Sequence, residues 1–318
     1  MTYSTDPITT PSGTPMPSAS LMFDLRGPGI PGGNTPKSAE LGSGTAIGRR
    51  IAIGGRFERA AAGPGCDDVR MRLSYRRPSC QWELRPGEIH VCSVALAASP
   101  GCIAHLEGVL SPEERRRACR FRTAALWEAF VAGRGILRTI LGGCLKLPPS
   151  NVPLDYGERG KPRICGGYRL RFNLSHSGGQ ALYALALDCE VGVDLEQIRP
   201  MPDCDSIAAR FFSAAEVRDL LSVPPDQRVE AFFACWTRKE AYVKAVGDGL
   251  CLPLDSFRVS MLPSEPPQLD ATGDSHEWSL FDVSPGQGYA AALVGERSRT
   301  EVYGWAFSDA EECTGYFG

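Results

Sequence analysis

One carboxylate in the stretch Val229–Leu250 occupies a costly position. Apolar residues recur there at helical spacing, which predicts one helix ending at Gly247. Glu240 lies on or beside the apolar stripe, where an acid needs a paired cation. Lys239 and Lys244 flank it, so the three residues indicate either a charged site or an ordinary Glu240–Lys244 pair on a half-exposed helix. The stripe consists of Val229, Phe232, Phe233, Trp236 and Val243.

A second pair of acids lies on a predicted strand, Val191–Glu196. An extended chain points the side chains of Asp194 and Glu196 to one face and those of Val193 and Leu195 to the other. Two neighbouring carboxylates repel each other, and a shared cation would relieve this repulsion. Because the ligands are oxygens with no Cys or His cluster nearby, Mg²⁺ is the leading candidate. The alternative is an exposed strand with two solvated acids.

Basic residues offer partners for an anion. Residues 111–138 hold seven arginines against three acids, a local excess of four positive charges. His176 lies in a run of small residues, Ser175–Gly179. This run suits a phosphate better than a hydrolase nucleophile, because the Gly-x-Ser-x-Gly elbow is absent and adjacent strand residues point apart. A solvated helix face and a plain surface turn are the structural alternatives.

Alternating strands and long helices must position these residues. Ser111 and Ser213 each open a helix with a capping box, closed by Glu114 and Glu216. The capping box gives Glu216 a complete structural explanation, against which a catalytic role must be weighed. Strands are predicted at 88–96, 170–174, 180–188, 191–196, 257–261, 277–283 and 289–294, and further helices at 124–145, at 205–221 with a break near Ser213, and at 229–247.

Composition excludes several classes of protein. The 318 residues are 43% hydrophobic and carry a net charge of −3, which argues against a nucleic-acid or anionic-membrane partner. No apolar run of membrane-spanning length and no secretory signal is visible, so we expect a cytoplasmic protein. The 12 cysteines form no Cys-x-x-Cys pair and are interpreted as buried thiols in a reducing compartment. Of the first 50 residues, 28 are Pro, Gly, Ser or Thr, which predicts a disordered extension.

Taken together, the motifs resemble the 4′-phosphopantetheinyl transferases of the larger monomeric (Sfp) type, over roughly residues 82–305. Each motif is weak alone, but their order and spacing are specific. They are Gly160-Lys161-Pro162, Phe172-Asn173-Leu174-Ser175-His176-Ser177-Gly178, Gly192-Val193-Asp194-Leu195-Glu196, Arg210-Phe211-Phe212-Ser213 through Glu216, Trp236-Thr237-Arg238-Lys239-Glu240-Ala241-Tyr242-Val243-Lys244, and Gly247-x-Gly249-Leu250.

The resemblance implies an α+β fold of two similar halves related by a pseudo-twofold axis, with the active site in the cleft between them. The halves would span residues 81–190 and 191–307, after an extension at 1–80 and before a frayed tail at 308–318. It also implies a reaction in which the phosphopantetheine arm of coenzyme A moves to a serine of an apo acyl or peptidyl carrier protein. Adenosine 3′,5′-bisphosphate would leave.

The resemblance assigns roles to named residues. Asp194, Glu196 and Glu240 would hold Mg²⁺, Lys244 would reach the pyrophosphate with help from Lys239, and Glu240 or a metal-bound water would be the base. Glu216 would help to orient that step. The remaining coenzyme A contacts would come from Ser175 and His176 at the 3′-phosphate, Lys161 and Pro162 beside the adenine, and Arg117, Arg120 and Arg122 as an outer phosphate clamp, with Arg134 as a further candidate.

Two other functions compete with this interpretation. A non-catalytic module could use the same fold to bind coenzyme A or carrier proteins, but it would be expected to lose a metal carboxylate or the helix lysine. A serine hydrolase could use Ser175 or Ser177 with His176, and its activity would not respond to removal of Mg²⁺. Fatty-acid, polyketide and nonribosomal-peptide carriers all remain open as substrates, and family analogy favours secondary metabolism.

Overall fold

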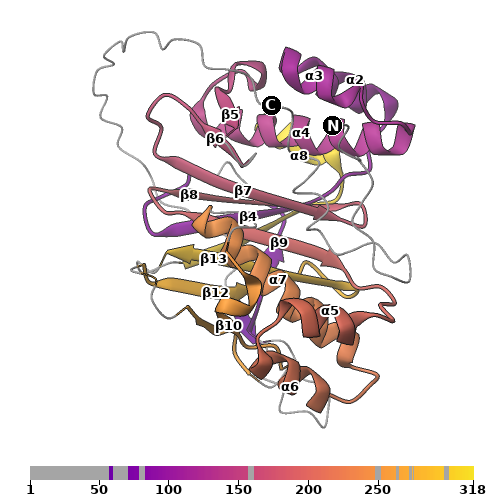
Figure 1. Ribbon diagram of the computed structural model, residues 1–318. Helices are drawn as coiled ribbons and strands as arrows, with labels where there is room; N and C mark the ends of the chain where they lie inside the picture. Colours follow the sequence, from indigo (N-terminus) through magenta and orange to yellow (C-terminus); the bar gives the residue numbers. More distant parts are fainter. Residues whose placement is uncertain are drawn as a thin grey trace, which may run out of the picture.

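The computed structural model describes residues 57–59, 71–78, 83–156, 161–247, 252–262, 265–271, 274, 276–296 and 301–318. Its architecture is α+β, with a four-stranded and a three-stranded sheet, three two-stranded pairs and two groups of helices (Figure 1). Trp82, Gly160 and the motif after Gly247 lie outside the described residues. Among the helices within these ranges, none is long and apolar enough to span a membrane.

The first sheet has the strand order β14-β4-β8-β7. It is built from β4 (Glu88–Ala95), β7 (Leu170–Ser177), β8 (Gln180–Leu187) and β14 (Glu301–Phe307). β14 runs parallel to β4, whereas the other pairs are antiparallel. The strand β14 near the end of the chain therefore belongs to the sheet of the N-terminal half. This differs from the expected division at residues 190 and 191.

The second sheet has the order β12-β13-β9, and both of its pairs are antiparallel. Its strands are β9 (Val191–Gln197), β12 (Trp278–Asp282) and β13 (Tyr289–Glu296). β12 and β13 form the hairpin that the sequence predicted. Shorter strands complete the described elements: β1 (Phe57–Arg59), β2 (Met71–Leu73), β3 (Tyr75–Arg76), β5 (Leu154–Tyr156), β6 (Pro162–Ile164), β10 (Arg258–Val259) and β11 (Leu269–Asp270).

Helices lie on the outer side of each sheet (Figure 1). The first sheet carries α2 (Pro100–Gly108), α3 (Pro112–Ala118), α4 (Ala124–Leu145) and α8 (Ala310–Phe317). The second carries α5 (Cys204–Phe211), α6 (Ala214–Ser222) and α7 (Arg228–Val246). A 3₁₀ turn at Pro149–Asn151 follows α4, and a second at Leu254–Ser256 precedes β10.

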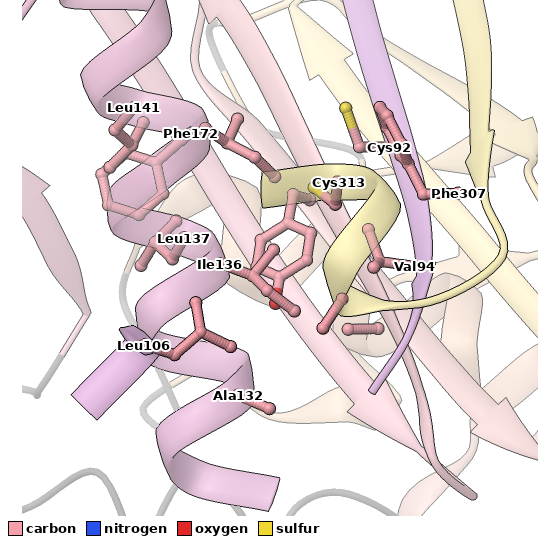
Figure 2. Packing of buried hydrophobic residues seen from close by; sticks show 14 of the residues in the cluster. Cys92, Val94, Leu106, Ala132, Ile136, Leu137, Leu141, Phe172, Phe307 and Cys313 are labelled. Atoms are coloured by element: carbon pink, nitrogen blue, oxygen red, sulfur yellow. The ribbon is translucent and has the colours of Figure 1, made fainter. Parts of the chain in front are cut away.

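Alternation along the strands creates three apolar layers. On β8, Tyr183 and Leu185 face the α4 side, whereas Leu182 and Ala184 face the other sheet. The middle layer also contains Val193 of β9, so the two sheets bury a common face against each other. In the layer beneath α4, side chains from α2, α4, α8 and the first sheet converge (Figure 2). The third layer joins α5, α6 and α7 to the second sheet.

Most predicted elements are confirmed. The long helix α4 spans the predicted 124–145, and α7 ends where Gly247 takes a positive φ of 80° that favours glycine. Ser111 and Ser213 both form the predicted capping boxes. The strand predicted at 257–261 shrinks to the two residues of β10.

Two stretches differ from the sequence-based expectation. The tail expected after Phe307 is helix α8, which Asp309 caps by accepting from the Glu312 backbone N–H at 2.8 Å. Burial of Ala310 and Cys313 explains this order, because a short polar helix is held by its packing. Within the expected extension, 71–76 form strands, and the Tyr75 hydroxyl donates to the Val283 carbonyl at 2.7 Å. Leu73 is the one residue of 71–76 that the structure shows as a buried apolar side chain, and Tyr75 packs partly buried against the same cluster. Two such residues in a polar stretch form too weak a pattern to predict a strand.

Asp274 fastens α7 to the second sheet. The Tyr242 hydroxyl of α7 and the Trp278 indole of β12 both donate to Asp274 Oδ2, at 2.7 and 2.6 Å, and the His276 backbone N–H donates to Oδ1 at 2.9 Å. Burial opposes ionisation of Asp274. The hydrogen bonds outweigh burial and lower its pKa from 3.8 to about 2.

We therefore expect Asp274→Asn to destabilise the protein by about 1–3 kcal/mol at pH 7, because charge-assisted hydrogen bonds weaken. A depressed pKa stabilises the fold above the unfolded value of 3.8, and this contribution is lost as the pH falls through about 2. The deficit of the variant, measured by urea unfolding, should therefore be smaller at pH 3 than at pH 7. The exposed Asp226→Asn is the control, and an equal deficit at both pH values would contradict the account.

Candidate active site

Gly192 lets α7 lie directly on β9. A Cβ at this position would lie 2.0 Å from the Ala241 carbonyl oxygen and 2.3 Å from the Ala245 amide nitrogen. With no side chain in between, the helix backbone touches the strand. Glu240 and Lys244 of the helix are thereby brought to the acids that follow Gly192.

Three acids are buried at this junction. Asp194, Glu196 and Glu240 are 0%, 2% and 1% exposed. Val193 and Leu195 lie in the layer between the sheets, which confirms that Asp194 and Glu196 share the opposite face of β9. The interpretation of these acids as solvated is therefore wrong, and burial of this kind requires hydrogen bonds or cations around them.

Side chains of β7 hold the two strand acids. Ser175 Oγ donates to Asp194 Oδ1 and Ser177 Oγ donates to Glu196 Oε2, each at 3.0 Å. Asn173 Oδ1 accepts from the Val193 backbone N–H at 3.1 Å. Because β7 and β9 are edge strands of different sheets, these side chains take over the role of a main-chain ladder.

Lys244 lies against Asp194. Its Nζ donates to Asp194 Oδ1 at 2.7 Å and to Ser175 Oγ and the Val193 carbonyl, each at 3.2 Å. Within the described ranges, no three His, Cys, Asp or Glu side chains are already arranged to hold a metal ion. The Lys244 ammonium group therefore balances the negative charge of Asp194.

Glu240 resists ionisation. Its pKa is raised from 4.5 to about 7, first by burial and then by the negative charge of Asp194 and Glu196, while Lys244 opposes the rise. Its Oε1 is buried and makes no hydrogen bond with any described residue. This oxygen is poised either to receive a proton or to bind a cation.

His176 and Arg134 form a basic end of the site. Burial of the imidazole, together with the charges of Lys244 and Arg134, lowers the pKa of His176 to about 4. Arg134 is 4% exposed, and its Nη1 has no hydrogen-bond partner in the described part of the chain. Its guanidinium lies 5.8 Å from the ring centre of Phe130 and 5.6 Å from that of Tyr156. The same guanidinium is paired with a buried acid, because its Nε lies 4.0 Å from Glu114 Oε1. The Nη1 group beside a neutral histidine is left to bind an anion.

A cavity of about 490 Å³ lies at the C-terminal end of α7, where Gly247 lines it. Lys161, Pro162, Arg171 and Gly247 are among the residues that line it. Lys161 Nζ donates to the Lys244 carbonyl at 2.8 Å, so the loop that carries Lys161 is tied to the end of α7.

Comparison with known proteins identifies the family of this chain. Residues 190–294 match the model of the 4′-phosphopantetheinyl transferase superfamily. The chain is 40% identical over 210 residues to the 4′-phosphopantetheinyl transferase HetI of Nostoc sp., covering 65% of this chain and 87% of that protein. The chain belongs to this superfamily.

Other members of the superfamily are similar over much of their length. The chain is 33% identical to the 4′-phosphopantetheinyl transferase Sfp of Bacillus subtilis, over 56% of this chain and 79% of Sfp. A holo-(acyl-carrier-protein) synthase from Bacillus anthracis, solved in complex with CoA (3′,5′-ADP), covers 34% of this chain and 96% of its own at 23% identity. Its TM-score of 0.31 is too low to support an inference.

Glu216 and Lys239 of this phosphopantetheinyl transferase lie apart from the three acids. Both are fully buried, and Lys239 Nζ lies 2.8 Å from Glu216 Oε1. Lys239 also donates to the carbonyls of Leu254 and Phe257 at 2.7 and 2.8 Å, and Glu216 accepts from the Val259 backbone N–H at 2.8 Å. The expected roles of Glu216 in catalysis and of Lys239 at coenzyme A find no support here, because their charges join α6, α7 and β10.

The three arginines of the expected outer clamp differ in their surroundings. Arg120 and Arg122 are exposed, and the Arg117 guanidinium lies 5.6 Å from the ring centre of Phe130. Arg134 is the arginine that acts electrostatically on His176. All four arginines stay predictions as contacts of the anion.

The depressed pKa of His176 gives a direct test of the basic end. In the free protein we expect its imidazole to titrate near pH 4, as followed by NMR. Addition of adenosine 3′,5′-bisphosphate should raise this pKa, because a bound phosphate offsets the charges of Arg134 and Lys244. Arg134→Met should weaken the shift while the surface variant Arg116→Met should not. If the pKa of His176 stays the same when the nucleotide is added, the phosphate does not bind beside His176.

Sequence reasoning missed three contributors. Gly192 and Asn173 were named only within motifs, and Ser177 only within a motif and as a candidate hydrolase nucleophile, although each positions the acids. A usable signal existed: Asn173, Ser175 and Ser177 recur every second residue, with the same spacing as Asp194 and Glu196. Nothing in the sequence indicated that the two strands would face each other.

Proposed function

We propose that this phosphopantetheinyl transferase moves the phosphopantetheine arm of coenzyme A to a serine of an apo acyl or peptidyl carrier protein and releases adenosine 3′,5′-bisphosphate. The observation that carries the proposal is the buried set of Asp194, Glu196 and Glu240 with Lys244 among them. Three acids next to a basic pocket suit a polyphosphate bound together with a cation.

The donor set fits Mg²⁺. All three side chains offer oxygen, which is the ligand type that Mg²⁺ prefers, and Glu240 Oε1 is a buried oxygen with no hydrogen bond from the described residues. When bound, Mg²⁺ would neutralise negative charge on the pyrophosphate during transfer. The activity should accordingly require a divalent cation.

The protein's own residues divide the remaining work. Arg134 and His176 bind the 3′-phosphate, and Lys244 binds a pyrophosphate oxygen. Glu240 accepts the hydroxyl proton of the carrier serine through the carboxylate oxygen that does not hold the cation, and its raised pKa suits it to this role. The serine oxygen then forms a bond to the β-phosphorus as the bond between that phosphorus and the bridging oxygen breaks. The leaving group is the nucleotide.

The cavity beside Lys161 would receive the adenine. Pro162 and Gly247 offer a lining without charge, and Lys161 holds the loop against α7. The two helix-covered sheets would correspond to the two similar halves, with coenzyme A lying in a cleft between them. We further expect a monomer that works in the cytoplasm.

Mass spectrometry tests the function. The protein is mixed with coenzyme A, Mg²⁺ and each member of a panel of apo acyl and peptidyl carrier proteins, and the carriers are weighed. We expect at least one carrier to gain one phosphopantetheine arm, and chelation to abolish the gain. Binding of coenzyme A with no gain on any carrier would favour the non-catalytic module instead.

A further inference from the structure

We propose that Tyr156 is a positioning residue for Arg134: its hydroxyl occupies the carboxylate of Glu114, which keeps the guanidinium of Arg134 available to an anion. The inference rests on the proposed function, in which Arg134 contacts the 3′-phosphate of coenzyme A. It adds the reason why a buried arginine beside a buried acid does not form hydrogen bonds with that acid.

Glu114 of α3 lies between two buried arginines of α4. Its exposed fraction is 2%, and those of Arg134 and Arg138 are 4% and 3%. One carboxylate cannot neutralise two guanidinium groups, so one positive charge is left over in a place that water hardly reaches. The hydrogen bonds of the carboxylate decide which arginine carries this charge.

Arg138 holds one oxygen of Glu114. Its Nε donates to Glu114 Oε2 at 2.5 Å, and the Ser111 backbone N–H of the capping box donates to the same oxygen at 2.8 Å. Arg138 Nη1 donates to the carbonyls of Pro149 and Val152, each at 3.2 Å. Arg138 is therefore a structural arginine, which ties α4 to α3 and to the turn that follows α4.

Tyr156 of β5 holds the other oxygen. Its hydroxyl donates to Glu114 Oε1 at 3.2 Å, and burial raises the pKa of this hydroxyl above its usual value, so it stays a donor at neutral pH. Arg134 Nε lies 4.0 Å from the same oxygen, which is beyond hydrogen-bond range. The tyrosine, and not Arg134, thus makes the hydrogen bond to Oε1.

Without this hydroxyl, Arg134 would be drawn onto Glu114. A shift of about 1 Å brings its Nε within hydrogen-bond range of Oε1, and arginine and carboxylate groups often pair through two parallel bonds. Such a pair turns the guanidinium and occupies a terminal nitrogen. In the structure, by contrast, Nη1 has no hydrogen-bond partner among the described residues, and the guanidinium lies 5.6 Å from the ring centre of Tyr156.

The charge left on Arg134 acts at the site. The pKa of His176 is lowered first by burial and then by the charges of Lys244 and Arg134. A 3′-phosphate beside this imidazole would accept from Arg134 Nη1. The Tyr156 hydroxyl should therefore affect the binding of the 3′-phosphate and leave the binding of the rest of coenzyme A unchanged.

The binding of two coenzymes by the purified full chain tests this inference without any turnover. Affinities for coenzyme A and for 3′-dephospho-coenzyme A, which lacks only the 3′-phosphate, are measured by isothermal titration calorimetry in the presence of Mg²⁺. We expect the wild type to prefer coenzyme A and Tyr156→Phe to reduce this preference about tenfold, as for the loss of one charge-assisted hydrogen bond. The affinity for 3′-dephospho-coenzyme A should stay the same.

Two further variants separate positioning from a general effect on the fold. Tyr303→Phe removes a hydroxyl that donates to Glu301 on β14, and it should keep the wild-type preference. Adding Glu114→Gln to Tyr156→Phe removes the charge that attracts Arg134, so the double variant should regain part of the preference. A tyrosine that only stabilised the fold would make the double variant worse than the single one.

Two results would overturn the inference. They are an unchanged preference in Tyr156→Phe and an equal weakening of both coenzymes, which a purely structural role would give. In either case the transferase function stands if the wild type still modifies a carrier. A wild type that binds both coenzymes equally would remove the contact of Arg134 with the 3′-phosphate, and the inference with it. A reduced preference in Tyr156→Phe with no carrier modified would keep the inference and remove the transferase function.

Discussion

Glu240→Gln is expected to lower kcat/KM for carrier modification by about 10³-fold, within the range seen when a general base is removed. The amide keeps the shape of the side chain but can neither accept the serine proton nor offer a charged oxygen to a cation. Because Gln carries no charge beside Asp194 and Glu196, we expect no loss in the free energy of unfolding. Rates would be measured by the mass gain of the carrier over time.

A matched control for this variant lies on the same helix. Glu230 is exposed in the first turn of α7, and Glu230→Gln should keep the wild-type rate. A folded Glu240→Gln protein with a normal rate would remove both the metal and the base assignment of Glu240. Loss of activity together with unfolding would instead point to a structural role of this residue.

Gly192→Ala is expected to cost roughly 3 kcal/mol of stability, at the upper end of the usual penalty for overpacking. The added methyl group meets the Ala241 carbonyl oxygen and the Ala245 amide nitrogen, which are backbone atoms of α7 and cannot turn aside. Where the protein still folds, α7 must shift away from β9. A displacement of about 1 Å at a catalytic group costs on the order of 10²-fold in rate.

Gly286→Ala serves as the comparison, since a Cβ at Gly286 meets no atom within 4 Å. Urea unfolding and carrier modification would be followed for both variants. We expect only Gly192→Ala to lower the stability of the protein and the rate of carrier modification. Wild-type behaviour of both variants would mean that the close approach of α7 to β9 is not needed to assemble the acids.

The sequence predicted the helices and strands of the site better than the contacts between them. Helix α7, strand β9 and the shared face of Asp194 and Glu196 follow from periodicity, which is a local property. The pairing of β7 serines with β9 acids is a contact between two sheets, and no local pattern encodes it. For the same reason, the parallel pairing of β14 with β4 was not predicted, because these two strands lie far apart in the sequence.

The sequence also did not predict which charged side chains are buried or which partners they contact. Lys239 and Lys244 both flank Glu240 in sequence, yet one is enclosed with Glu216 and the other contacts Asp194. The helical geometry makes the side chains of Lys239 and Lys244 point in different directions. Only the elements packed around α7 determine which of the two side chains reaches the acids. Arg134 and Arg120 differ in the same way: both lie in the arginine-rich region, and burial alone distinguishes them.

In the proposed function, the three buried acids serve the transfer of the phosphopantetheine arm from coenzyme A to a carrier serine. The most direct measurement follows both products of one reaction: the mass gain on the serine of an apo carrier and the adenosine 3′,5′-bisphosphate released. We expect equal amounts of the two products, with formation of both dependent on Mg²⁺ and lost in Glu240→Gln. Release of the nucleotide without carrier modification, or modification that persists in Glu240→Gln, would contradict it.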